Sequence, residues 1–496
     1  MMKKIGGSLF LILWLYSNLS FASATIQLTL DKVVDIAINN SYRTKLLQFD
    51  IRRSLHWLRA RQASLKTQIY MNLQTPEINN LSEYKWNSTL GKDEIVRQNT
   101  QRWQGDMSVK YPIILFGYPT NGYLSLNYKV YRYLQKDHGN DLSDYYNRLY
   151  LKFEQPFLLP NELRNDLKEA ELNLKYLKFE YMSERMEIIE DISDDYYDIF
   201  ELTYYEEIYR NKLRYLDELK QIILNEMDDG NNREMDLEQI ELETSNTLER
   251  LWSNRSSLRE QTVRLKQRLR LNPDDSLYVI PEIHISPVIV DLDQAIRYGF
   301  ENSPRLKRLK IDKKQAKLDV ENERGENAFH LKLEMTYGLE KGNHRFDNLW
   351  DNFDNSNSVT LNAYIPIVDG GERRERIQAE LLNVSKRDLQ IKEEKEDIRN
   401  DISNAYKNMN EYYRRSEKMR QNLLLAMQIT ETSIGKFKNY QISLQDLLQI
   451  IEKTKETEEN FIDIYLGYRF SLLDLMTETY YDFEKNISLG EEIEIE

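Results

Sequence analysis

Two long segments of this chain are almost free of the residues that break helices. The segment from Glu162 to Met227 contains no proline and no glycine, and the segment from Glu372 to Lys436 contains only Gly435. Apolar residues in the first recur at alternating spacings of three and four, a pattern typical of coiled-coil packing. A continuous helix of this length would extend for about 100 Å. Because such a helix cannot fold back into a globule, each one needs neighbours along its whole length.

Each long segment ends in a short break and is followed by a second helical segment. The breaks read NEMDDGNNREMDLEQ at 225–239 and KFKNYQISLQDLLQ at 436–449. The sequence therefore predicts two long helical hairpins, at 161–271 with a tip near 228–233 and at 371–478 with a tip near 438–443.

The chain also repeats itself. The stretch LTLDKVVDIAINNSYRTKLLQFDIRRS at 28–54 aligns without gaps with VDLDQAIRYGFENSPRLKRLKIDKKQA at 290–316. This indicates a tandem duplication, with a first repeat at 25–271 and a second at 290–478. Helices are expected at 31–64 and 293–326, a proline-containing linker at 272–289, and an acidic tail, disordered at its EEIEIE end, at 479–496.

Short alternating segments follow the first helix of each repeat. Strands are predicted near 67–75 and 148–156 in the first repeat, and near 329–338 and 358–367 in the second. Apolar residues alternate with polar ones, which suits a barrel wall with lipid outside and water inside. A half-buried sheet on a soluble core alternates in the same way. A further hairpin at 106–133 either joins the barrel or lies outside it.

The N-terminus indicates export. Lys3 and Lys4 precede an apolar run that ends at Phe21-Ala22-Ser23-Ala24, which predicts a signal peptide at 1–24. The chain has no cysteine, so a lipid-modified N-terminal cysteine and disulfide bonds are excluded. No later segment is apolar enough for a membrane helix, so a membrane-spanning form would need a closed barrel.

The composition argues against several other functions. A formal net charge of −14 argues against nucleic acid as a partner. The five histidines are scattered, so no metal site is expected. No set of nucleophile, base and acid emerges, so we predict neither a cofactor nor an enzymatic activity.

Taken together, these features resemble the TolC-like outer-membrane efflux proteins over essentially the whole mature chain. The most specific stretch is IPIVDGGERRERIQAE, which is similar to the exit of that family from barrel strand to periplasmic helix. Here Pro366 would end the strand, and Gly370 and Gly371 would turn the chain into a charged helix. In the first repeat QPFLLPNELRNDLKEAE places Pro156 opposite Pro366, and Pro160-Asn161 replaces the two glycines.

The hairpin tips carry the second part of the resemblance. The family usually has Tyr-x-x-Gly-x-x-Ser-x-x-Asp-Leu-Leu at this point. Gly230 and Asp236 fit in the first repeat, and Ser443 and Asp446 fit in the second. Tyr440 stands where glycine is expected, so Asn439 is expected to take the left-handed turn.

The resemblance implies that these tips line a closed periplasmic mouth and contact a periplasmic adaptor. In relatives, two aspartate rings form the constriction. Asp446 matches the first of them, whereas Gln449 occupies the second position. Asp236 is the counterpart of Asp446 in the first repeat. Either aspartate can instead serve as a helix cap or first-turn acid. Three copies of Asp446 around a trimer axis would attract cations.

The fold class implied is mostly α with membrane β, a homotrimer that combines a β-barrel with a periplasmic helical tunnel. The function implied is the outer-membrane channel of a tripartite efflux system in a Gram-negative bacterium, powered indirectly by an inner-membrane pump and embedded in outer-membrane lipid. Three alternatives stay open: the channel of a type I protein secretion system, a periplasmic adaptor with coiled-coil hairpins, and a coiled-coil envelope protein without a pore.

Overall fold

The structure of the chain is a computed structural model. It describes residues 25–87, 89, 91–137, 140–228, 233–273, 276–280 and 282–490. The predicted signal peptide at 1–24 lies outside these residues. The chain divides into two compact units. Among the described residues, the sheet unit lies within 49–179 and 307–393, and the helical unit lies within 25–48, 180–306 and 394–490.

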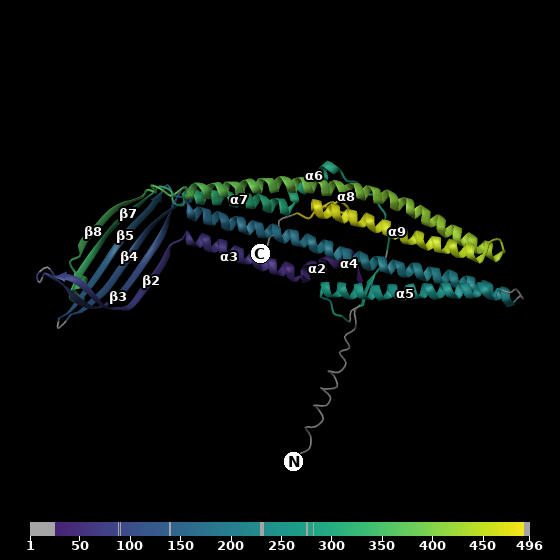
Figure 1. The fold of residues 1–496 in the computed structure, drawn as a ribbon, viewed down its shortest axis with the longest axis horizontal. Coiled ribbons are helices and arrows are strands. Elements are labelled where there is room, and N and C mark those ends of the chain that lie inside the picture. The colour runs from purple at the N-terminus through teal and green to yellow at the C-terminus, as the bar shows by residue number, and fades with distance from the viewer. Residues whose placement is uncertain are drawn as a thin grey trace, which may run out of the picture. The chain divides into compact units, whose positions relative to one another are not determined.

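The sheet unit is built around one antiparallel sheet, which has six strands within the described part of the chain (Figure 1). The strand order is β2-β3-β4-β5-β7-β8. The bounds are Gln68–Asn87, Lys92–Leu115, Tyr118–Asp137, Asn140–Phe157, His330–Asn343 and Asp354–Tyr364.

The strand bounds differ from the sequence-based expectation in two ways. β2 and β5 extend well beyond the predicted 67–75 and 148–156, because they run along the two strands of the extra hairpin. That hairpin, predicted at 106–133, forms β3 and β4, and these strands lie in the sheet between β2 and β5 (Figure 1). A 3₁₀-helix at Phe346–Leu349 connects β7 and β8, and β8 ends at Tyr364, before Pro366.

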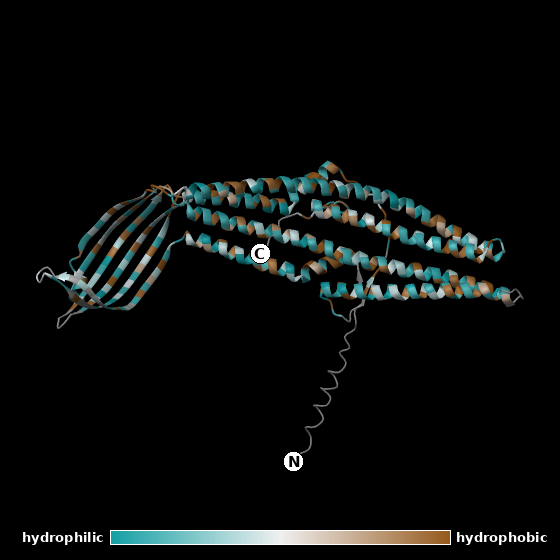
Figure 2. Ribbon diagram, in the orientation of Figure 1, coloured by the Kyte–Doolittle hydropathy of each residue, from teal (hydrophilic) through white to brown (hydrophobic). Residues whose placement is uncertain are grey.

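The two faces of the sheet differ sharply in polarity, as the alternating colours along the strands show (Figure 2). Residues that lie directly opposite each other on neighbouring strands point to the same face of the sheet. The strand register therefore shows which residues of all six strands share a face. One face carries Ile69, Met71, Val109, Leu126, Leu151, Leu333, Met335, Val359 and Leu361. The other carries Asn72, Ser108, Asn127, Tyr150, Lys152, Glu334, Thr336 and Thr360.

Polar groups pair with each other on the polar face. The hydroxyl of Ser108 donates to Oδ1 of Asn127 at 2.6 Å, between β3 and β4. The ammonium of Lys152 lies 2.6 Å from Glu154 and 3.7 Å from Glu334, which joins β5 to β7. A sheet with one apolar and one charged, hydrogen-bonded face suits a boundary between lipid and water.

Long helices account for most of the remaining chain. Two of them have 67 residues and two have 36 (Figure 1). The shorter α2–α3 and α6–α7 pairs break at Ser41 and Ser303, at the Asn-Ser step that interrupts each of the expected helical stretches 31–64 and 293–326. No helix of the described residues is both long and apolar enough to cross a membrane. The bounds are α2 Leu30–Asn40, α3 Tyr42–Ser64, α4 Glu162–Asp228, α5 Glu234–Leu269, α6 Leu292–Asn302, α7 Pro304–Gly325, α8 Glu372–Lys438 and α9 Leu444–Thr479.

The equal helix lengths follow the repeat seen in the sequence. α4 and α8 have the same length, and so do α5 and α9, while the extra length of the first half lies in β3 and β4. The matching lengths are consistent with the tandem duplication, which stays a prediction from the sequence.

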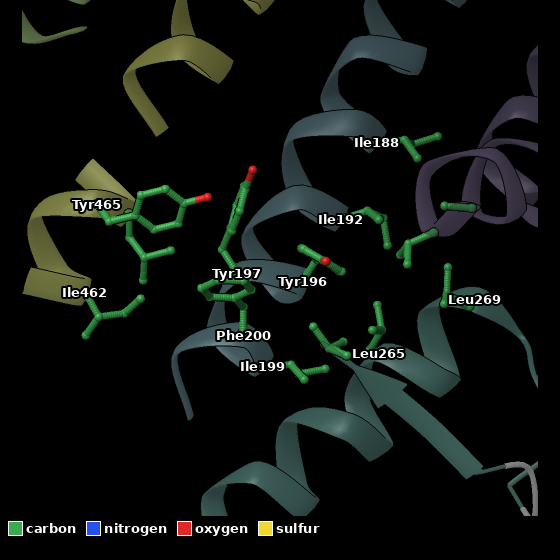
Figure 3. Close-up of a cluster of buried hydrophobic side chains, with 14 residues drawn as sticks. Ile188, Ile192, Tyr196, Tyr197, Ile199, Phe200, Leu265, Leu269, Ile462 and Tyr465 are labelled. Atoms are coloured by element: carbon green, nitrogen blue, oxygen red, sulfur yellow. The ribbon is translucent and has the colours of Figure 1, made fainter. Parts of the chain in front are cut away.

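The core of the helical unit is formed by α2, α4, α5 and α9 (Figure 3). Tyr197 and Phe200 of α4 lie toward Ile462 and Tyr465 of α9, and other core residues of α4 face α5 and α2. The rings of Tyr196 and Tyr197 meet edge to face at 5.5 Å, and those of Phe200 and Tyr465 lie 6.0 Å apart and tilted by 32°. The buried members are Val33, Ala37, Ile188, Ile192, Tyr196, Tyr197, Ile199, Phe200, Leu265, Leu269, Val279, Ile462, Tyr465 and Leu466.

Two segments for which no strand was predicted take part in small sheets of the helical unit. β6 at Ser276–Val279, within the predicted linker 272–289, pairs in parallel with β1 at Thr25–Leu28. β9 at Tyr481–Asp482 pairs with β10 at Ile487–Ser488, so residues 479–490 of the predicted acidic tail are ordered. Glu484 between them makes a bidentate ion pair with Arg469 at 2.7 and 3.1 Å. The EEIEIE segment lies outside the described residues.

Candidate functional site: the hairpin tips and the strand-to-helix junctions

Both hairpin tips lie in the helical unit and share one apolar cluster. It joins the ends of α4, α5, α8 and α9, so the two tips form a single packed structure. Its buried members are Leu219, Ile223, Ile240, Ile434, Phe437, Leu444, Leu447 and Ile451. Lys438 of α8 adds an ion pair with Glu218 of α4 at 2.9 Å.

The second tip ends α8 with a Schellman motif. The N–H of Gln441 donates to the carbonyl of Lys436 at 2.9 Å, and the N–H of Tyr440 donates to the carbonyl of Phe437 at 3.0 Å. Tyr440 takes the left-handed conformation with φ 57°. The expectation that Asn439 would do so was wrong, because Asn439 continues the helical turn and its side-chain amide donates to the carbonyl of Gly435.

Asp446 lies in the first turn of α9, whose N-cap is Ser443. The N–H of Asp446 donates to the Ser443 hydroxyl at 3.1 Å, and that hydroxyl lies 2.6 Å from the Asp446 carboxylate. Asp446 and Gln449 are both exposed. Asp446 thus takes the first-turn position of the helix while its carboxylate remains accessible to solvent.

Asp236 occupies the corresponding position in α5 but has a different environment. Its carboxylate accepts from Nε of Arg233 at 2.8 Å, and Arg233 also pairs with Glu226 of α4. The guanidinium lies 4.8 Å from the centre of the Phe437 ring. Arg233 therefore joins α4, α5 and α8, and it partly neutralises Asp236. No pattern in the sequence indicated this role of Arg233. Gly230 lies outside the described residues.

Buried carboxyl groups occur on α9 further from the tip. Burial, together with Glu207 and Glu459, raises the pKa of Glu458 to about 7. Burial, together with Asp401, Glu190 and other acids, raises the pKa of Glu478 to about 7. These carboxyl groups therefore become ionised near neutral pH.

The second-repeat junction, in the sheet unit, depends on backbone conformation. Gly370 and Gly371 have φ of 65° and 92°, and a Cβ at either position would meet no atom within 4 Å. The glycines are therefore needed for the left-handed backbone and not for space. The Asp369 carboxylate accepts from the Gly371 N–H at 2.9 Å, and this bond lowers the pKa of Asp369.

The first-repeat junction achieves its turn with side chains. Pro156 lies within β5 opposite Lys332, so it does not end the strand. Asn161 caps α4 by accepting from the Arg164 N–H at 3.0 Å. Asn121, in the β3–β4 hairpin, accepts from the Leu163 N–H at 3.1 Å and donates to the Pro160 carbonyl at 2.8 Å. The extra hairpin thus helps to cap α4. The turn of the hairpin is Phe116-Gly117, between β3 and β4. The turn-rich stretch at 117–122 predicted the hairpin but not the capping role of Asn121.

The fold can be compared directly with solved structures. The chain matches the outer membrane channel CmeC of Campylobacter jejuni with a TM-score of 0.64 at 15% identity, over 93% of this chain and 87% of that one. It matches the outer membrane protein VceC of Vibrio cholerae with a TM-score of 0.65 at 14% identity, over 91% and 95% of the two chains. This chain has the TolC-like outer-membrane channel fold.

A third TolC-like structure agrees. The open state of the MtrE outer membrane channel of Neisseria gonorrhoeae matches with a TM-score of 0.61 at 12% identity, over 92% of this chain and 89% of that one. No family model matches the sequence, and no curated protein matches it. The TolC-like fold is thus apparent from backbone geometry at sequence identities of 15% or less.

Proposed function

We propose that three copies of this chain form an outer-membrane channel that exports small molecules or ions. The sheets of the three copies form one barrel in the outer membrane, and the helices form one periplasmic tunnel. A periplasmic adaptor contacts the hairpin tips, and an inner-membrane pump supplies the energy through it.

The observation that carries this proposal is the two-faced sheet. Apolar side chains occupy one face of all six described strands, while paired charges and amides occupy the other. A soluble protein would have to cover the apolar face with its own core. Here Met71, Leu73 and Val359 are 66%, 65% and 70% exposed. Lipid is the environment that makes such exposure favourable.

The constriction is proposed to carry one acidic layer, formed by Asp446. This carboxylate is exposed at the start of α9 and interacts with a neutral hydroxyl, whereas Asp236 is bound by Arg233. Three like charges at a narrow opening attract cations and repel anions. The channel is therefore expected to select for cations.

The test is a single-channel recording in a planar bilayer. The full chain is purified from outer membranes in mild detergent, and the reversal potential is measured across a KCl gradient. Wild type is compared with Asp446→Ala and with Gln449→Ala, a matched control one turn further along α9 in which an exposed neutral side chain is removed.

The expected result is a small, cation-selective conductance that loses selectivity in Asp446→Ala and keeps it in Gln449→Ala. Equal selectivity in all three proteins would retain the channel but refute the Asp446 layer. A protein that inserts no pores would refute the proposed function.

A further inference from the structure

We propose that β8 of each copy pairs with β2 of the next, so that three copies close one barrel of 18 strands. This inference rests on the proposed trimeric channel and adds to it the size of the barrel and the register of its seam. One strand pair in each repeat would give four strands per chain. The described sheet has six, because β3 and β4 lie between β2 and β5.

The extra hairpin, β3 and β4, has one apolar and one polar face, as a strand in a barrel wall must. Met107 and Val109 of β3 and Leu126 of β4 lie on the same face as Met71 of β2, through the registered pairs Met71–Met107, Ile69–Val109 and Val109–Leu126. The start of β4 is also bound to β5, because Gln155 of β5 donates to the carbonyl of Thr120 at 2.8 Å. β3 and β4 therefore continue the apolar and polar faces of their neighbours.

β2 and β8 are the two ends of the strand order, and each needs a partner. A strand edge in lipid would leave its N–H and C=O groups without hydrogen bonds, at several kcal/mol for each group. One chain cannot supply these hydrogen bonds by pairing its own β2 with its own β8. About eight strands are needed for an interior just wide enough for side chains, and this sheet directs Arg148, Tyr150 and Lys152 to its polar face.

The direction of the strands permits closure with another copy. Six antiparallel strands place β2 and β8 in opposite directions, so β8 of one copy runs antiparallel to β2 of the next. The two faces must also continue across the seam. A shift of one residue would exchange lipid-facing and pore-facing side chains, so only every second register is allowed.

The stagger of the sheet selects one of these registers. Residues directly opposite one another lead across the sheet from the first residue of β2 to Ser358 of β8, six residues before the strand ends at Tyr364. The partners are, in order, Gln68, Lys110, Ser125, Lys152, Thr336 and Ser358. With the ends of β2 and β8 level in the barrel, the next copy continues this line six residues into β2. Ser358 then pairs with Gln74, and Thr360 pairs with Asn72.

The same stagger yields a barrel of ordinary geometry. A shift of six residues for every six strands makes the shear number equal to the strand number, which corresponds to a strand tilt of about 36°. With strands about 4.8 Å apart, 18 strands at that tilt form a barrel about 34 Å across its backbone, against about 23 Å for 12 strands. Barrels of 16–18 strands enclose an aqueous channel. The membrane section is therefore wide, and the narrowest point lies elsewhere.

Disulfide cross-linking tests the seam, and the chain suits it because it has no cysteine of its own. The variant Asn72→Cys/Thr360→Cys places two thiols opposite each other on the pore face, within the Cα distance that a disulfide needs. Met71→Cys/Thr360→Cys is the matched control, since residue 71 points to the opposite face. Each protein is oxidised in the outer membrane and then separated without reductant.

The expected result is a covalent trimer with Asn72→Cys/Thr360→Cys, reversed by reductant, and monomers with the control pair. A higher yield of covalent trimer with Tyr70→Cys or Gln74→Cys in place of Asn72→Cys would overturn the register. Monomers from all four pairs, in proteins that still conduct ions when reduced, would overturn the seam and leave the proposed channel standing. Loss of pores from the wild type would instead overturn the channel itself.

A second measurement tests whether β3 and β4 are in the wall. A fluorophore is attached to Leu126→Cys or, as a control, to Asn127→Cys, and the trimer is placed in vesicles that contain brominated lipid. Strong quenching at position 126 and weak quenching at position 127 are expected. Equal quenching at the two positions would place the hairpin outside the wall and reduce the barrel to 12 strands.

Discussion

The buried Lys212 is expected to hold the two helical hairpins together near their tips. Its side chain, on α4, is 5% exposed and donates to Glu243 of α5 at 2.6 Å and to Glu452 of α9 at 2.5 Å. Glu452 has further cationic neighbours, with Lys455 at 3.4 Å and Arg250 at 3.8 Å. One ammonium thus joins both hairpins of the chain.

The perturbation is Lys212→Met, which preserves the length of the side chain and removes its charge. Removing one partner from a fully buried ion pair destabilises a protein by about 3–5 kcal/mol. Glu243 and Glu452 keep 33% and 35% of their side-chain exposure, so water replaces part of the lost interaction. We therefore expect a loss of about 2 kcal/mol in the stability of the tip.

Hydrogen exchange of the backbone amides measures this loss locally. A loss of 2 kcal/mol corresponds to a fall of about 30-fold in the protection of amides near the tip. Lys220→Met is the control, because its 2.8 Å pair with Glu241 is half exposed to water. That control is expected to change protection by less than about fivefold.

The dependence on pH provides a second check. Burial raises the pKa of Glu452, and the hydrogen bond and charge of Lys212 lower it. The lowering effect is the larger, so the pKa of Glu452 lies below its ordinary value. A carboxyl with a lowered pKa contributes stability above its unfolded pKa, and this contribution is lost as pH falls through the lowered value. The difference in amide protection between wild type and Lys212→Met should therefore shrink as pH falls through that range. Equal protection in Lys212→Met and Lys220→Met would refute the reasoning.

Three further predictions concern other parts of the chain. Leu333→Arg on the apolar face should destabilise the membrane-inserted trimer by about 2–4 kcal/mol in urea unfolding, whereas Thr336→Arg on the polar face should change little; equal effects would contradict the orientation of the sheet. Tyr440→Gly should raise the protection of tip amides by about 1–2 kcal/mol, because it relieves a left-handed tyrosine, and lowered protection would show that the side chain matters more. Burial raises the pKa of Glu478 to about 7 in the folded chain from an ordinary value of 4.5. The free energy of unfolding should therefore rise by on the order of 3 kcal/mol as pH falls from 7 toward 4.5, and denaturant midpoints should rise with it. Glu458 has the same raised pKa and contributes a rise of its own, so Glu478→Gln should reduce the rise without abolishing it. An unchanged profile would exclude Glu478 as a source.

The long helices could be predicted from the sequence because their signals are local. A run without proline and glycine has few alternatives to helix, and the apolar spacing adds the need for neighbours. The junction at Gly370-Gly371 was predictable for the same reason, since a positive φ favours glycine wherever it occurs.

The remaining features depend on contacts that are distant in the sequence. The place of β3 and β4 in the sheet was left open, because alternation specifies the two faces of a strand and not its neighbours. Asn121 caps α4 across 42 residues, which no local pattern indicates. The left-handed residue of the second tip was misassigned because propensity favours asparagine, whereas the Schellman hydrogen bonds of Gln441 and Tyr440 determine which residue adopts that conformation.

The two hairpin tips have the same helix lengths, but their first-turn aspartates have different surroundings. Asp236 and Asp446 each lie in the first turn of a 36-residue helix that follows a 67-residue helix. Three residues earlier stands Arg233 in one tip and Ser443 in the other. The arginine binds its aspartate and also Glu226, while the serine caps the helix and leaves its aspartate exposed. In the proposed trimer the negative charge at the constriction therefore comes from the second tip, while the first tip contributes cohesion between α4, α5 and α8.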